Sequence, residues 1–168
     1  MLFRSYGDNR IVMIGDSSAG VSAQAVASHE YGHHVALNRV NAPWPAEDWG
    51  TKRWASAVNV CSRVAAGTAF PGDESDHYTL NPGEAFAETY RALNESKAGA
   101  TSFQWLVVDA SFFPDPSALQ AVEQDVVQPW VAPTTQILAG RFVPRGRSVW
   151  TLPLATPLDG NQIGRAHV

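Results

Sequence analysis

The spacing of apolar residues in the first third of the chain predicts a short strand followed by a long helix. Residues 10–15 ("RIVMIG") form a β-branched run that ends at a glycine, which predicts a strand. Residues 19–38 ("AGVSAQAVASHEYGHHVALN") lack proline and are rich in alanine. They predict a helix, and Ser17 or Ser18 stands where a helix cap is expected.

Three further helices are predicted downstream. Residues 51–67 carry apolar side chains at helical spacing, and a glycine ends the pattern. Those side chains are Trp54, Val58, Cys61 and Val64. Residues 81–96 begin with Asn81 as the cap and Pro82 in the first turn, a strong start signal. Residues 115–130 begin with Asp-Pro and end at a proline, which again predicts a helix.

The pattern changes toward the C-terminus. Residues 103–108 fit a strand or a helix equally well, and residues 131–162 alternate with Pro and Gly, which indicates β structure. We therefore expect a mainly α (α+β) domain over residues 6–130. Residues 131–162 are expected to be the start of a truncated β-rich region.

Both chain ends have the pattern of sequencing-adapter bases. Residues 1–5 (MLFRS) and the final IGRAHV can be back-translated so that the codons for IGRA are the reverse complement of bases within the MLFRS codons. Two unrelated protein ends have no reason to be complementary as DNA. We expect residues 1–5 and 163–168 to be artefacts of a metagenomic fragment, and the natural protein to extend beyond both ends.

Charge and hydropathy exclude two classes of partner. Leaving out Arg4 and Arg165, 10 basic residues face 16 acidic ones, a net charge of −6. A nucleic-acid partner usually requires a basic face, so we expect none. The sequence contains no apolar run long enough to predict a membrane span.

The clearest chemical signal is H-E-x-x-H, formed by His29, Glu30 and His33. On a helix, residues four apart lie on one face, so both imidazoles can reach one ion at about 2.0–2.1 Å. Glu30 is displaced around the helix, where it borders the metal and can act as a general base on a water. The alternative is an ordinary amphipathic helix in which Glu30 pairs with His34.

A second acidic pair follows on a later predicted helix. Glu84 and Glu88 are four residues apart, again on one face. A catalytic zinc site needs three protein ligands, and Glu84 is the candidate for the third. The alternative is a capping glutamate, because Glu84 is the third helical residue after Asn81. Glu88 is either a hydrogen-bond acceptor that orients His29 or a solvated surface charge.

H-E-x-x-H on one helix with E-x-x-x-E on a later helix resembles the gluzincin branch of zinc metallopeptidases. The resemblance covers about residues 10–92 and implies a zincin-like fold. It implies a Zn²⁺ ion held by His29, His33 and Glu84. Glu30 would then be the general base, and Glu88 would support the first histidine.

The same resemblance implies further parts of the site. Enzymes of this branch usually provide a tyrosine or histidine that donates to the oxyanion, and His77 and Tyr78 are the local candidates. Related folds bind the peptide along an edge strand, for which Ile11, Val12, Met13 and Ile14 are the candidates; a plain core strand is the alternative. Family habit implies a secreted or cell-envelope location.

These patterns together predict a zinc-dependent peptidase acting on a peptide or protein substrate. Two alternatives stay open. One is a catalytically inactive zincin-like binding protein of the cell envelope or exterior. The other is a zinc hydrolase that acts on non-peptide substrates.

Overall fold

The computed structural model describes residues 21–102, 104–105 and 107–131, and this part of the chain is mainly helical. The mainly α prediction is confirmed for it, whereas the zincin-like fold stays a prediction. Its helices, with 3₁₀ turns labelled η, are α1 (Ala23–Leu37), α2 (Ala46–Trp49), α3 (Lys52–Ala57), α4 (Val60–Ala65), η1 (Tyr78–Leu80), α5 (Pro82–Lys97), η2 (Ala110–Phe112) and α6 (Pro116–Val127).

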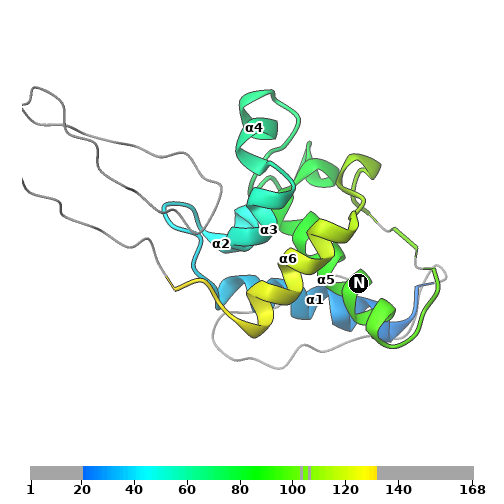
Figure 1. Cartoon of the computed structure of the whole chain (residues 1–168). Coiled ribbons are helices and arrows are strands. Elements are labelled where there is room, and N and C mark those ends of the chain that lie inside the picture. The colour runs from blue at the N-terminus through cyan, green and yellow to red at the C-terminus, as the bar shows by residue number, and fades with distance from the viewer. Residues whose placement is uncertain (1–20, 103, 106, 132–168) are drawn as a thin grey trace, which may run out of the picture. The chain divides into compact units, whose positions relative to one another are not determined.

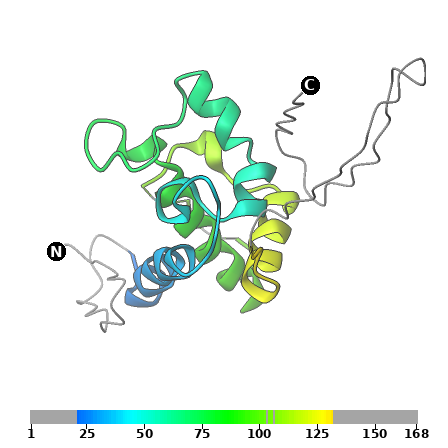
Figure 2. The same ribbon diagram turned by 90° about the vertical axis from the view of Figure 1, so that its left-hand side faces the viewer.

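Helix α5 is the centre of the described part. It lies between α1 and α6, and α2 and η1 contact its N-terminal end (Figures 1 and 2). Residues 81–89 are buried without interruption, so this half of the helix is covered on all sides. Its buried polar residues, Glu84, Glu88, Thr89 and Arg91, must find partners inside the protein.

The apolar core forms where α3, α5 and α6 meet. Trp54 of α3 and Phe86 of α5 are fully buried and pack edge to face, with ring centroids 5.5 Å apart. Each aromatic ring of this kind contributes about 1.5–3 kcal/mol by leaving water. Val122 of α6 and Phe112 of η2 complete the same cluster.

Side chains cap the three long helices. Ser22 accepts from the Ala25 amide at the start of α1, so the prediction of Ser17 or Ser18 as the cap is wrong. The helix begins four residues later than its alanine-rich pattern, because that pattern does not specify which serine provides the cap. Asn81 caps α5 and Asp115 caps α6, as predicted.

The helix predicted over 51–67 is divided in two. Asn59 adopts the left-handed conformation (φ 57°, ψ 43°), which ends α3 and begins α4 in a new direction. Asparagine tolerates this conformation better than most residues. Cys61 is consequently exposed on α4 instead of lying on an apolar face.

Asp125 of α6 joins α6 to the start of α3. Its buried carboxylate accepts from the backbone amides of Arg53 (2.8 Å) and Trp54 (3.2 Å). The Arg53 guanidinium also donates to it, at 2.8 Å. A side chain distant in sequence therefore satisfies the free amides of the α3 N-terminus.

Several predictions fall on residues outside the described ranges. They are the strand at 10–15, the β region at 131–162 and the artefactual ends, and all of them stay predictions. Of 103–108, the described residues 104–105 and 107–108 belong to no helix or strand.

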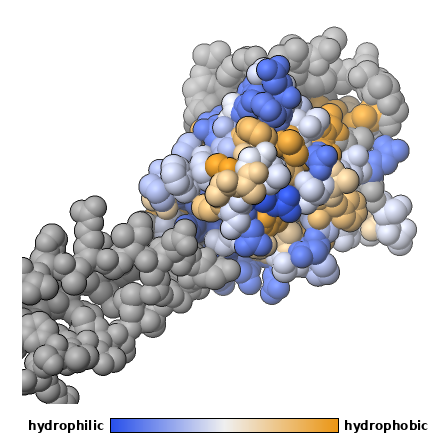
Figure 3. Space-filling view, turned by 90° about the horizontal axis from the view of Figure 1, so that it is seen from above, coloured by the Kyte–Doolittle hydropathy of each residue, from blue (hydrophilic) through white to orange (hydrophobic). Residues whose placement is uncertain are grey.

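No helix within the described ranges is both long and apolar enough to cross a membrane. On the face drawn in Figure 3, apolar residues form several patches that polar residues separate.

Candidate metal centre

His29 and His33 project from one face of α1 toward α5. Their Nε2 atoms lie 3.3 Å apart, and the rings meet edge to face at 75°. This is the arrangement that a four-residue spacing on a helix allows. Both side chains are mostly covered, with 12% of His29 and 19% of His33 exposed.

Gly32, between the two histidines, allows α1 and α5 to approach closely. A Cβ atom at this position would lie only 2.7 Å from the Cα of Ala87 and 3.0 Å from its carbonyl oxygen. Any larger residue therefore requires the two helices to separate. This close contact falls within the H-E-x-x-H segment, so it influences how far the histidines reach toward α5.

Glu84, in the first turn of α5, is the acidic residue that meets both histidines. Its Oε2 lies 3.1 Å from Nε2 of His29, and its Oε1 lies 3.3 Å from Nε2 of His33. A capping box would direct this carboxylate to the amide of Asn81, but that amide donates to the Tyr78 carbonyl instead. Glu84 is therefore oriented toward α1.

One ligand atom from each of His29, His33 and Glu84 can be chosen so that all three lie within 4.8 Å of one another. Ligands at 2.0–2.1 Å around a tetrahedral ion are about 3.3 Å apart. The closest ring-to-ring and ring-to-carboxylate distances are 3.1–3.3 Å, although they use different oxygens of Glu84. The three residues thus form a group that could hold one metal ion.

The two carboxylates next to His29 favour a positive charge at this point. Burial lowers the pKa of His29, but hydrogen bonds and charge from Glu84 and Glu88 raise it more, to about 9. Burial likewise raises the pKa of Glu84, but contacts with His29 and His33 bring it well below its usual range. The cluster therefore stabilises a cation, whether a proton or a metal ion.

Glu88 orients His29 from the other side of the ring. Nδ1 of His29 donates to Oε2 of Glu88 at 3.1 Å, which leaves Nε2 directed at Glu84 and His33. Glu88 is 1% exposed, so it is not a solvated surface charge. Such an acceptor fixes the ring orientation of a metal-binding histidine.

Tyr78 in η1 also reaches the cluster. Its hydroxyl donates to Oε2 of Glu84 at 2.7 Å. Burial is the largest cause that raises the pKa of Tyr78, followed by contact with Glu84 and the charges of Glu74 and Glu30. The phenol therefore stays protonated at neutral pH. Glu30, which follows His29 on α1, is half-buried.

His77 makes its contacts with the loop that precedes η1. Its Nδ1 lies 2.9 Å from Oδ2 of Asp73, and its ring stacks on Phe70 with centroids 3.8 Å apart. His77 therefore contacts residues of that loop, whereas Tyr78, the next residue, contacts Glu84. The candidate substrate strand, Ile11 to Ile14, lies outside the described residues.

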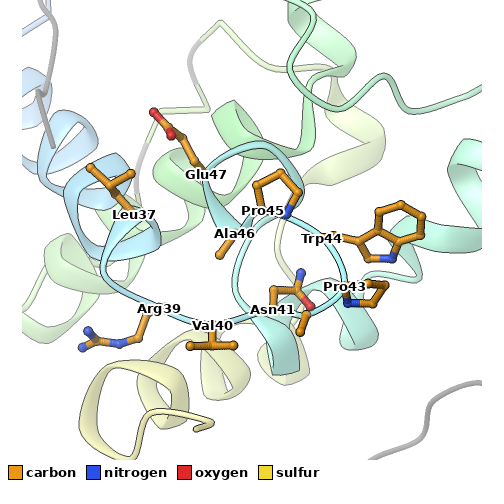
Figure 4. A pocket seen from close by; sticks show the side chains of 10 residues that line it. Leu37, Arg39, Val40, Asn41, Pro43, Trp44, Pro45, Ala46 and Glu47 are labelled. Carbon is orange, nitrogen blue, oxygen red and sulfur yellow. The ribbon is translucent and has the colours of Figure 1, made fainter. Parts of the chain in front are cut away.

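An open groove of about 510 Å³ follows the C-terminal end of α1. Leu37 and Glu47 border one side of it, and Pro43 and Trp44 border the other (Figure 4). None of the three candidate ligands lines this groove. It is therefore a separate surface feature.

Two residues around the site were not predicted from the sequence. Gly32 is inside the motif, but its role depends on Ala87, 55 positions later. Arg91 donates to Glu88 through Nε (2.9 Å) and Nη2 (2.5 Å). The signal for Arg91 was its position three residues after Glu88, on the same helix face.

No protein-family model matches the chain, and no curated protein or solved structure matches it significantly.

Proposed function

We propose that the protein is a zinc-dependent peptidase of the gluzincin type. The observation that supports this most is the convergence of His29, His33 and Glu84, two imidazoles and one carboxylate, on a common point. Two histidines and a glutamate are a ligand set of catalytic zinc sites, which keep a further position for water or substrate.

A bound zinc ion would supply Lewis acidity and bring the pKa of a coordinated water near 7. Glu30 would take the proton of the attacking water and pass it to the leaving amine. Tyr78, which is protonated and donates to Glu84, would turn its O–H from Glu84 to the carbonyl oxygen as negative charge develops there. Glu30 follows His29 on α1 and is displaced about 100° around the helix, so it would border a bound ion without ligating it.

The proposal extends to substrate and place. A peptide or protein is the expected substrate, and a secreted or cell-envelope location follows from the family resemblance alone. Activity on non-peptide substrates, or an inactive binding role, would retain the ligand set. Only the reaction distinguishes these three functions.

Zinc content and peptide hydrolysis test the proposal. The purified full chain should contain about one zinc ion per molecule by elemental analysis and should cleave a peptide library. Glu30→Gln should keep the zinc and lower kcat about 10²–10⁴-fold. His33→Ala is the matched variant that should lose zinc and activity together. Zinc binding without cleavage of any peptide would leave only the two alternatives.

A further inference from the structure

We propose that Arg91 is a positioning residue for the metal centre, acting on His29 through Glu88. This inference rests on the proposed function, because it assigns Arg91 a role in how tightly the site holds its ion. Nothing in the H-E-x-x-H or E-x-x-x-E motifs includes this arginine. The argument depends on an unbroken sequence of contacts inside α5 and between α5 and α1.

The contact between Arg91 and Glu88 is a buried two-point fork. Nε donates to Oε2 at 2.9 Å and Nη2 donates to Oε1 at 2.5 Å. The side chains are 2% and 1% exposed. A planar guanidinium that meets both carboxylate oxygens fixes the carboxylate in position as well as in charge.

The oxygen that Arg91 Nε contacts is the same one that faces His29. Oε2 of Glu88 lies 3.1 Å from Nδ1 of His29. Rotation of the carboxylate would therefore break both contacts together. With Arg91 in place, Glu88 can accept only along the direction that keeps Nε2 of His29 directed at Glu84 and His33.

The positive charge of Arg91 also affects the site. Glu84 and Glu88 place two buried carboxylates on opposite sides of one imidazole ring. Arg91 neutralises the one that is not a candidate ligand. The remaining negative charge then belongs to Glu84, which lies where a cation would bind.

Arg91 has two further contacts that hold the guanidinium in place. Nη1 donates to Glu95, and Nη2 donates to the carbonyl oxygen of Gln104. Glu95 is 30% exposed, and a glutamine at this position keeps an oxygen that can accept from Nη1. Glu95→Gln therefore changes the charge beside Arg91 but keeps the contact, and it serves as the control. If Arg91 had only a structural role, all these contacts would support the stability of the fold. None of them would then change how tightly the site binds zinc.

The test is the affinity of the full chain for Zn²⁺, measured by chelator competition. Arg91→Lys, which keeps the charge but loses the fork, should lower the affinity about 10–100-fold. Glu95→Gln should stay within about twofold of the wild type. Arg53→Lys, a matched change at the Asp125 pair, should reduce stability without changing affinity. An Arg91→Lys protein that binds zinc as tightly as the wild type would overturn the proposal.

A double-mutant cycle separates positioning from general stability. If Arg91 acts through Glu88, Arg91→Lys should have less than about a threefold effect on affinity once Glu88→Gln is present. A full and independent loss in both backgrounds would mean a structural role and would reject the inference. The d–d spectrum of the Co²⁺-loaded Arg91→Lys protein should also differ from that of the wild type, because the His29 ring is no longer fixed.

A measurement on the wild type does not depend on folding of any variant. The ¹⁵N–¹H resonance of Arg91 Nε should shift when Zn²⁺ is added, while that of Arg53 Nε stays in place. An unmoved Arg91 signal in a zinc-loaded protein contradicts the inference but leaves the proposed function intact. A wild-type chain that binds no zinc overturns both.

Discussion

Replacing Gly32 with alanine should loosen the metal centre without melting the helices. The new Cβ would lie 2.7 Å from the Cα of Ala87 and 3.2 Å from its Cβ. Carbon atoms in contact need about 3.5–4.0 Å, so α1 and α5 must separate by about 1 Å. Overpacking of this kind lowers the free energy of unfolding by about 1–3 kcal/mol. The higher helix propensity of alanine offsets about 1 kcal/mol of that loss. The net loss of stability is therefore modest.

The effect on zinc should be larger than the effect on stability. His29 and His33 move with α1 and Glu84 moves with α5, and a shift of about 1 Å is half of a metal–ligand bond length. We expect Gly32→Ala to bind zinc at least about tenfold more weakly, by chelator competition, with far-UV circular dichroism unchanged. Gln24→Ala, an exposed change on the same helix, should have no effect. Wild-type affinity in Gly32→Ala would refute the view that close helix packing positions the ligands.

Three other predictions follow from the same contacts. Tyr78→Phe should lower kcat about 10²–10³-fold in the zinc-saturated protein, by steady-state kinetics on a peptide; equal kcat would remove its role as a donor. Because the pKa of His29 is raised to about 9, the ring is protonated below that pH and zinc must displace a proton. Zinc affinity should therefore rise with pH up to about 9, and calorimetry in two buffers at pH 7.5 should detect at least one proton released per ion, because the coordinated water also ionises near pH 7; no release would contradict the assignment of His29. Asp125→Ala should lower the free energy of unfolding in urea by about 1–3 kcal/mol, because it leaves the α3 amides and Arg53 without their partner. Zinc affinity should not change with it, and a large loss would show that the α3–α6 contact also positions the site.

The local signals in the sequence were sufficient to predict where α5 and α6 begin. Asn81 and Pro82 mark the start of α5, and Asp115 marks that of α6, because capping is a contact between near neighbours. The division at Asn59 could not be predicted in the same way. Its left-handed backbone is a conformation of one residue, and the periodicity of the apolar side chains carries no information about that.

From the sequence, only the part of the site that lies on one helix could be predicted. The spacing of His29 and His33 places both rings on one face whatever the rest of the fold is. The position of Glu84 beside them depends on helix packing across 55 residues, so the sequence could offer Glu84 only as a candidate, beside its alternative as a capping residue. Arg91 was not found because an arginine three residues from a glutamate is common on helix surfaces, and burial alone distinguishes this pair.

Anomalous diffraction at the zinc edge, on crystals of the full chain grown with Zn²⁺, examines the central claim most directly. The expected result is one peak per molecule, bonded at about 2.0–2.1 Å to Nε2 of His29, Nε2 of His33 and a carboxylate oxygen of Glu84. A zinc-loaded crystal with no peak between α1 and α5, or with the ion bound by other residues, would contradict it.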